Sequence, residues 1–423
     1  MQDLVVEPSK STKSRAIIAV VAVVSLVGAF FAVRWQLGNM LADLTRFDDP
    51  NAPDIAAVAT DWAPADPIAR WLKASTVADP AEAIRLYEQT IQLAPNDYRW
   101  RIELARALEQ DEQPGRAETE LKKALELAPA YAYPRWHLGN FYLRQDRPDE
   151  AVAELKKAAE NNQFYRDQVF SLAWDYFSKD PARLENLAGE GAEARARLAY
   201  FFAARGYAAD ALRNWNRLSD EEKAERDYVA RTIAQGLFEK RAFPQALEFS
   251  RQLGLDTEAA PETVTNGTFE KGVSQGDGSR FGWALVRNDP NVEMAADTRV
   301  KHEGTRSLRT AFKGKVKPGF ANIYQTVVIE PGKRYKLRFW VRTENLRSAG
   351  LPLLQVVNAN DDKVIASSPP FSGGTADWHE VSVEFAPPPN SNGITMRTVR
   401  SDCGEDCPIT GIFWYDDFEL SRS

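Results

Sequence analysis

The chain has 423 residues, of which 27% are charged and 44% are hydrophobic, an ordinary balance for a folded protein with room for two or three domains. Its formal net charge of −7 implies no basic surface, which argues against nucleic acid as a partner. Two cysteines and three histidines are a poor inventory for the usual four-ligand zinc site.

A basic N-terminus precedes an uncharged segment. Lys10, Lys13 and Arg15 come before residues 16–33, a run of 18 residues without a charge. As a helix this run spans about 27 Å, close to the ~30 Å thickness of a bilayer's hydrocarbon core. Trp35 follows where an interfacial side chain is expected.

These features predict a cytoplasmic tail over residues 1–15 and one transmembrane anchor over residues 16–35, with the bulk of the chain periplasmic or extracytoplasmic. A cleaved signal peptide is the alternative, because residues 27–29 (Val-Gly-Ala) are small enough for a cleavage site. The apolar run continues to residue 33, past that site, and favours the anchor. A buried helix of a soluble core is disfavoured, because no face of the segment is polar.

Residues 36–67 contain four prolines with acidic residues between them. This composition predicts a stalk or linker, starting with a short helical continuation to Thr45. A degenerate first copy of a helical repeat begins near Ile68.

Residues 71–163 repeat with a period of 34. Small residues recur where two helices approach closely, large apolar residues recur where neighbouring pairs meet, and prolines end the copies because they cannot continue a helix. The recurring positions are Ala83, Ala117 and Ala151; Tyr87, Leu121 and Leu155; Thr90, Ala124 and Ala158; and Pro95 and Pro129. In period and residue type this pattern resembles the tetratricopeptide repeat (TPR).

The repeat weakens beyond Gln163 but continues toward Leu255, so we expect about five helix pairs stacked as a right-handed, all-α solenoid over residues 68–255. The resemblance implies that the first helix of each pair lines a concave groove that binds a peptide or helix of a protein partner. The implied groove residues, many of them aromatic, are Arg99, Ile102, Arg106, Tyr133, Trp136, Asn140, Phe170, Trp174 and Tyr200. Alternatively, the stalk or the C-terminal domain folds back onto these rings.

After a linker over residues 256–263 the helical periodicity gives way to alternation and glycine-rich turns. Residues 334–342 (RYKLRFWVR) place Tyr335, Leu337 and Phe339 on one face of a strand. Further strands are predicted at residues 326–330, 352–358, 380–385 and 394–399. Short strands at this spacing predict a β-sandwich over residues 264–423.

Several landmarks of this region occur in a recognisable order. They are Asn266 to Glu270, Gly282-Trp283, His302 to Leu308, Tyr324-Gln325, Pro331-Gly332, Phe339 to Val341, Trp378 and Phe413 to Leu420. From Val264 to Leu420 the order resembles the jelly-roll carbohydrate-binding modules attached to many polysaccharide-active enzymes. A resemblance of fold does not by itself establish sugar binding.

The resemblance also implies a structural calcium ion. Its ligands would be Glu270, a carbonyl oxygen of Gly304 or Arg306, and Asp416. By strand parity Asp416 shares a face with Trp414 and Phe418 and is expected to point into the core, where a carboxylate needs a cation or several donors. Calcium takes carboxylate and carbonyl oxygens. The alternative is a carboxylate satisfied by backbone donors without a metal.

The expected glycan surface is the outer face of one sheet. It would carry Arg338, Trp340 and Arg342, with Gln355 and Arg397 on neighbouring strands. Aromatic rings stack on the apolar faces of sugars and arginine pairs with carboxylates, so this set suits an acidic polysaccharide. In the alternative interpretation Trp340 packs under a loop and the arginines form a solvated strand face.

Cys403 and Cys407 enclose a short loop, and beyond a membrane a disulfide between them is the natural interpretation; two free thiols are the alternative. No phosphate-binding loop, HExxH motif or Gly-x-Ser-x-Gly elbow occurs, and His137, His302 and His379 are scattered.

We therefore predict a non-catalytic, membrane-anchored scaffold that holds a protein partner through TPR repeats and a glycan through the sandwich. Proteins with these parts resemble accessory factors of envelope polysaccharide (exopolysaccharide) synthesis or export. A polysaccharide-processing enzyme with its site in the sandwich and a purely structural spacer are the rival interpretations.

Overall fold

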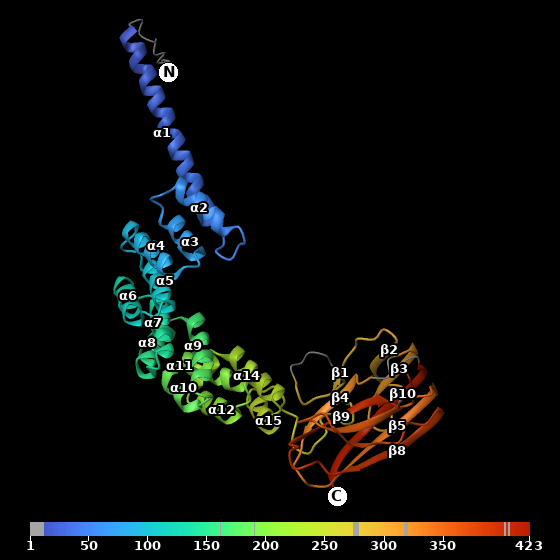
Figure 1. Ribbon diagram of the computed structural model, residues 1–423. Coiled ribbons are helices and arrows are strands. Elements are labelled where there is room, and N and C mark those ends of the chain that lie inside the picture. Colours follow the sequence, from blue (N-terminus) through green and yellow to red (C-terminus); the bar gives the residue numbers. More distant parts are fainter. Residues whose placement is uncertain are drawn as a thin grey trace, which may run out of the picture. The chain divides into compact units, whose positions relative to one another are not determined.

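The computed structural model describes residues 12–160, 162–189, 191–273, 279–316, 320–401, 403–404 and 407–423. The chain divides into two compact units, residues 1–189 and residues 190–423, and each unit is described by itself. The first unit is helical, and the second holds further helices and a two-sheet β-sandwich (Figure 1). Of the predicted tail, residues 1–11 with Lys10 lie outside the described residues, as does the side chain of Lys13.

The first unit begins with helix α1, Thr12–Leu44. Over Arg15–Leu44 this helix is long and apolar enough to cross a membrane, a description that a signal sequence also meets. The apolar run of residues 16–33 is exposed throughout. The helical continuation predicted beyond the span is present and ends one residue before Thr45.

The predicted stalk is instead largely helical and folded. Helix α2, Ala52–Trp62, and helix α3, Pro67–Thr76, pack with the end of α1 around a small core. The prolines were misinterpreted, because Pro53 and Pro67 lie in the first turns of helices, where a missing N–H costs nothing. The buried side chains of this core are Ala42, Ala56, Ala59, Ala69 and Leu72.

The remaining helices of the first unit follow the 34-residue period. Asp79 and Asp180 cap α4 and α10 by accepting hydrogen bonds from backbone N–H groups, and a proline follows each cap. Gly139 allows close packing, since a Cβ there would lie 2.7 Å from Cγ of Leu155 on the partner helix. The helices are α4 Pro80–Leu93, α5 Tyr98–Gln110, α6 Pro114–Leu127, α7 Ala132–Arg144, α8 Pro148–Glu160, α9 Gln163–Tyr176 and α10 Pro181–Ala188.

The second unit contributes five helices among its described residues. They are α11 Ala192–Ala203, α12 Ala208–Asn216, α13 Asp220–Ala224, α14 Asp227–Glu239 and α15 Phe243–Gln252. Helical structure ends at Gln252, close to the predicted boundary at Leu255. Within the described residues the helices form six successive pairs, from α3–α4 to α14–α15, and the short α13 lies between the last two pairs in the sequence. This is one pair more than the five predicted.

The sandwich consists of two antiparallel, five-stranded sheets. The sheet with the order β1-β4-β9-β6-β7 is called here the β4 sheet, and the sheet with the order β2-β3-β10-β5-β8 is called the β5 sheet. The strands are β1 Ala284–Leu285, β2 Val292–Asp297, β3 Ser307–Lys315, β4 Ile323–Val328, β5 Tyr335–Arg347, β6 Pro352–Asn358, β7 Val364–Ser367, β8 Gly374–Phe385, β9 Gly393–Arg400 and β10 Pro408–Arg422. The predicted fold class, a helical repeat followed by a β-sandwich, is confirmed.

Alternation in the strands builds the core between the sheets. Tyr335, Leu337, Phe339 and Val341 of β5 are each 0% exposed, as their spacing predicted. The Phe339 ring stacks on Phe418 of β10, with ring centroids 4.8 Å apart. The outer face of each sheet is the face directed away from this core.

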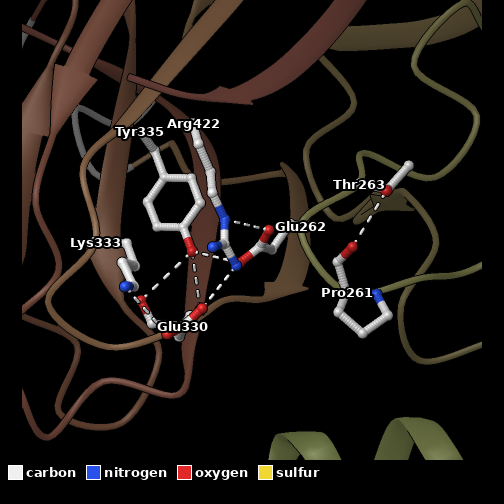
Figure 2. A network of polar contacts seen from close by, with 7 residues as sticks. All are labelled: Pro261, Glu262, Thr263, Glu330, Lys333, Tyr335 and Arg422. Atoms are coloured by element: carbon white, nitrogen blue, oxygen red, sulfur yellow. Dashed lines mark hydrogen bonds and ion pairs between the residues drawn. The ribbon is translucent and has the colours of Figure 1, made fainter.

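A polar network joins the start of the sandwich to its last strand (Figure 2). Arg422 donates from Nε to Glu262 at 2.7 Å and from an Nη atom to Glu330 at 2.7 Å. The Tyr335 hydroxyl donates to Glu262 at 2.7 Å, and burial, with the charge of Glu262, raises the pKa of Tyr335 to about 12. Glu262 is therefore fixed to the sandwich, although the sequence placed it in a linker.

Cys403 and Cys407 form a disulfide, with sulfur atoms 2.11 Å apart. The buried guanidinium of Arg400 donates to Sγ of Cys407 at 3.0 Å and to the backbone oxygens of Gly350 and Val316 at 3.1 and 2.6 Å. The loop is thereby fastened to the turn between β5 and β6.

Candidate functional site

A row of aromatic rings crosses the first helices of the repeats in the first unit. Trp136 on α7 contacts Tyr165 on α9, with ring centroids 5.9 Å apart, and Tyr98 on α5 contacts Tyr133 at 6.4 Å. Tyr131, 60% exposed, extends the row at 5.8 Å from Tyr98. The sequence interpretation named Tyr133 and Trp136 but missed the other three, although residues 98 and 131 recur at almost the repeat period.

Three of the predicted groove side chains are not accessible. Ile102, Phe170 and Trp174 are 0%, 1% and 4% exposed, so they are core residues of the helical layers. For Phe170 and Trp174 the register was extended from well-matched copies into a decayed one, where packing rather than the period decides exposure. Tyr200, 38% exposed, lies on α11 in the second unit.

The charges around the row are paired. Arg99 binds Asp97 at 2.6 Å, and Arg106 binds Glu103 at 3.2 Å. Asn140 donates to the backbone oxygen of Trp136 on its own helix at 2.7 Å. The exposed part of the row is therefore mainly aromatic.

Burial shifts the pKa values of His137 and Glu103, which lie beneath this surface. It lowers the pKa of His137 to about 4, with Arg106 and Arg144 adding to the effect, so the imidazole is neutral at pH 7 and packs on Tyr133 at 4.4 Å. Burial also raises the pKa of the Glu103 carboxyl, against the influence of Arg106. A neutral aromatic surface bordered by paired charges suits the apolar side of a peptide or helix.

On the sandwich, the predicted glycan set is divided between the two sheets. Arg338, Trp340 and Arg342 lie on the outer face of the β5 sheet, where Trp340 is stacked on His302 with centroids 3.9 Å apart. Arg338 binds Glu419 and Glu380, and Arg342 binds Asp377 at 3.0 Å. The Trp340 ring thus packs against His302, and the arginines beside it form ion pairs, which neither the predicted glycan surface nor the alternative of a solvated strand face included.

Gln355 and Arg397 lie in the β4 sheet, so the prediction that they neighbour the Arg338 strand is wrong. They belong to one row of cross-strand neighbours on the outer face, Tyr324–Arg397–Gln355–Ser367. Arg397 donates from Nε and Nη2 to Oε1 of Gln355 at 3.2 and 3.1 Å. No carboxylate pairs with Arg397 among the described residues, and the first three side chains of the row are half-buried while Ser367 is exposed.

The prediction from strand parity that Asp416 points into the core is wrong. Asp416 lies opposite Trp340, on the outer face of the β5 sheet, because a β-bulge at Asp417, whose φ is +49°, reverses the alternation before Phe418. Asp416 is nevertheless 0% exposed, covered by the loop that begins at His302. Its carboxylate accepts hydrogen bonds from the backbone N–H groups of His302 at 2.9 Å and Asp417 at 3.0 Å. Burial raises the pKa of Asp416 to about 6, and the charge of Asp417 adds to the shift.

Glu270 contacts the other end of the same loop. Its carboxylate accepts hydrogen bonds from the backbone of Thr305 at 2.7 Å and of Arg306 at 3.3 Å, and from the Thr305 hydroxyl, which lower its pKa. Gly304 has φ +61°, a conformation that glycine adopts without strain, and its lack of a Cβ leaves room for the Glu270 carboxylate beside the turn.

The oxygen atoms of these residues are ligands of the kind that a hard cation binds. Two carboxylates and the carbonyl oxygens of one turn are the oxygen ligands that calcium takes, and no cation pairs with buried Asp416 among the described residues. Within the described part of the chain no group of three His, Cys, Asp or Glu side chains could hold a metal, so carbonyls of Gly304 or Arg306 would have to complete the shell.

Two parts of the chain match known families. Residues 78–122 and 110–173 match the tetratricopeptide repeat, and residues 261–401 match a carbohydrate-binding domain. Both resemblances read from the sequence are thereby confirmed: the chain contains tetratricopeptide repeats and a C-terminal jelly-roll domain of the carbohydrate-binding kind. Both are non-catalytic kinds of domain, and no catalytic domain is matched.

Solved structures resemble the two regions separately. One titled "CBM4 structure and function" is 12% identical, covers 38% of this chain and 99% of its own, and has a TM-score of 0.28. The CBM22-1-GH10 modules of Clostridium thermocellum xylanase 10B with xylohexaose are 19% identical, covering 38% of this chain and 29% of theirs, with a TM-score of 0.26. YrrB, a TPR protein with an unusual peptide-binding site, is 17% identical, covers 47% of this chain and 90% of its own, and has a TM-score of 0.24. No curated protein matches the chain.

We propose that calcium binds between Glu270 and Asp416, and we expect it to stabilise the sandwich. At a concentration 100 times its dissociation constant the gain is about 2.7 kcal/mol. The raised pKa of Asp416 means that its ionisation disfavours folding progressively from about pH 4 to pH 6 unless a cation offsets it, so the gain should be larger at pH 7 than at pH 5. Thermal unfolding of the full chain in detergent, in chelator and in calcium, measures both effects.

Asp416→Asn should remove the calcium response, whereas Asp377→Asn, at an exposed partner of Arg342, should retain it. An unfolding temperature of the wild type that is the same in chelator and in calcium would leave Asp416 as a carboxylate satisfied by N–H donors alone.

Proposed function

We propose that this chain is a membrane-anchored, non-catalytic adaptor of the cell envelope. It binds a protein partner through the aromatic row of its TPR region and an acidic glycan through the outer face of the β4 sheet. The observation that carries the proposal is the contrast among the arginines of the sandwich: Arg338 and Arg342 are ion-paired, whereas Arg397 has a neutral amide as its described partner.

The chemistry of the β4 face supports an acidic ligand. Arg397 donates two hydrogen bonds to Oε1 of Gln355, a neutral acceptor that does not compensate the guanidinium charge, and Tyr324 provides a ring beside it in the same row. A guanidinium can bind a carboxylate through two parallel hydrogen bonds, and an aromatic ring packs on the apolar face of a sugar. A uronic acid residue offers both features.

The course of α1 supports an anchor rather than a cleaved signal peptide. Helix α1 continues past the apolar run to Gly38, where a Cβ would lie 2.9 Å from Cβ of Ala63 on the chain leaving α2. Arg34 binds Asp61 at 2.5 Å, and Ala42 is buried against α2 and α3. Cleavage near Ala29 would cut a helix whose remaining turns belong to a folded core.

An anchored chain with one protein-binding and one glycan-binding surface suits an accessory factor of envelope polysaccharide synthesis or export. The rival function of a polysaccharide-processing enzyme would need two carboxylates facing each other across a cleft. The row on the β4 face presents Tyr324, Arg397, Gln355 and Ser367, none of which is a carboxylate.

Replacing Arg397 tests the glycan surface. Arg397→Gln should weaken binding of linear uronic-acid oligosaccharides by tenfold or more, since a hydrogen bond to a charged group contributes about 1.5–3 kcal/mol. Isothermal titration of the full chain in detergent measures the loss. Arg342→Gln is the matched control, because that arginine is already paired with Asp377 on the other sheet. If only Arg342→Gln lost glycan binding, the glycan would bind the outer face of the β5 sheet and the proposal for the β4 sheet would be wrong.

Substitutions of Trp136 and Trp174 in the TPR region distinguish a binding-surface residue from a core residue. Trp136→Ala should reduce capture of a protein partner from detergent-solubilised native membranes by tenfold or more, since an anchoring ring commonly contributes about 2 kcal/mol or more. Trp174→Ala, at a residue 4% exposed, should instead destabilise the fold by about 3–5 kcal/mol. Circular dichroism with thermal unfolding separates the two effects. Unchanged partner capture by a folded Trp136→Ala variant would rule out the aromatic row as the binding surface.

The anchor predicts one topology. A reporter that is active only in the cytoplasm should be inactive when fused after Ser423, because the basic N-terminus is retained in the cytoplasm. N-terminal sequencing of the mature protein should find the apolar run intact. An active reporter would reverse the topology, and a mature chain starting near Phe30 would establish a signal peptide.

A further inference from the structure

The start of α15 lies on one margin of the outer face of the β4 sheet. Ile394 and Met396 of β9 are in the core between the sheets, so Gly393, Thr395 and Arg397 are directed outward. A Cβ at Gly393 would lie 2.8 Å from the ring of Phe243, the first residue of α15. The ring therefore covers the β9 backbone directly, which glycine alone allows.

Residues on three strands are buried at this margin of the outer face. Val328 of β4 and Val357 of β6 are 5% and 1% exposed, although neither belongs to the core cluster between the sheets. Thr326, which shares a row with Thr395 and Val357, is 6% exposed. Thr395 itself is half-buried, and in the next row along the strands, the Tyr324–Arg397 row, no side chain is fully buried.

Polar and aromatic contacts hold the α14–α15 turn and the start of α15 against the sandwich. Arg241, in the turn between α14 and α15, binds Asp362 at 2.5 Å, and its backbone oxygen accepts a hydrogen bond from Asn360 at 3.2 Å. Phe238 of α14 packs edge-on against Phe281, with centroids 5.2 Å apart. The turn from α14 into α15 is thus fastened to the β6–β7 hairpin, and Phe243 with this turn is called here the wall.

The wall runs parallel to the long direction of the Tyr324–Arg397 row. Phe243 covers Gly393, which lies four residues from Arg397 along β9, so the wall begins about 13 Å from the Tyr324–Arg397 row, with the Thr326–Thr395 row between them. The row itself crosses four strands spaced ~4.8 Å apart, or about 14 Å in all. A sugar chain that uses both Tyr324 and Arg397 lies along the row, with one of its edges toward the wall.

We propose that the wall determines specificity: the β4 face accepts an acidic glycan that is unbranched on the edge facing α15 and rejects one that carries a sugar substituent there. This inference rests on the proposed glycan function and adds a selectivity that the α14–α15 pair supplies to the sandwich. Because the jelly roll alone leaves this margin open, the discriminating contacts come from the helical part of the second unit.

Binding of paired probes to the full chain tests the proposal. The probes are linear uronic-acid oligosaccharides and the same backbones carrying a single sugar branch on each of the two edges in turn. Wild type should bind the linear form and one branched form, and should bind the other branched form at least tenfold more weakly. Phe243→Ala, which lowers the wall, should reduce that discrimination to threefold or less while leaving affinity for the linear form within twofold.

Phe249→Ala is the matched control, because this ring lies on the same helix at 2% exposure but packs on Trp215 rather than on the sheet. It should keep the discrimination of the wild type. If Phe243→Ala does not fold, Arg241→Ala loosens the wall by removing the ion pair to Asp362 and should reduce the discrimination in the same direction.

The outcomes separate the two proposals. Equal wild-type affinity for all three probes, with binding still lost in Arg397→Gln, would overturn the wall and retain the glycan surface. Discrimination that survives in the folded wall variants would also overturn it. Failure of wild type to bind any acidic probe would remove the glycan proposal and the wall together.

Discussion

The contact between the ring of Phe243 and the backbone of Gly393 determines what the second unit can present to a ligand. It brings the last helix pair onto the sheet at a position where a side chain would prevent the approach. Val328 and Val357 on the same face are buried without being part of the core between the sheets. The helices and the sandwich therefore share one apolar surface, consistent with their membership of one compact unit.

The outer faces of the two sheets also differ in what covers and pairs with their side chains. On the β5 sheet, the loop from His302 covers Trp340, and carboxylates neutralise the arginines on either side. On the β4 sheet, Arg397 is held by an uncharged partner, so its charge is available to a ligand. Composition is similar on both faces, with arginine and an aromatic ring on each. Only the partners of these side chains distinguish a packed face from one that can bind.

The TPR region shows a related distinction between position in a repeat and exposure. Trp136 and Trp174 both follow from the repeat register, yet the first is half-buried beside Tyr165 and the second lies in the core. A repeat period specifies which side of a helix a residue occupies. How much of that side remains open depends on the size of the neighbouring side chains and on how the next helix packs.

The sequence alone determined the 34-residue repeat, the alternating strands and the apolar N-terminal helix, because these depend on periodicities of 3.6 and 2 residues and on turn chemistry that local residues carry. The jelly roll followed from the resemblance of its ordered landmarks to carbohydrate-binding modules. That resemblance also implied that Glu270 and Asp416 lie near one loop. Tertiary structure decided the rest: the bulge at Asp417 moved Asp416 to the outer face, and the strand order put Arg397 and Arg338 in different sheets. Strand order, bulges and side-chain partners arise from contacts between residues far apart in the chain, and a local pattern does not encode them.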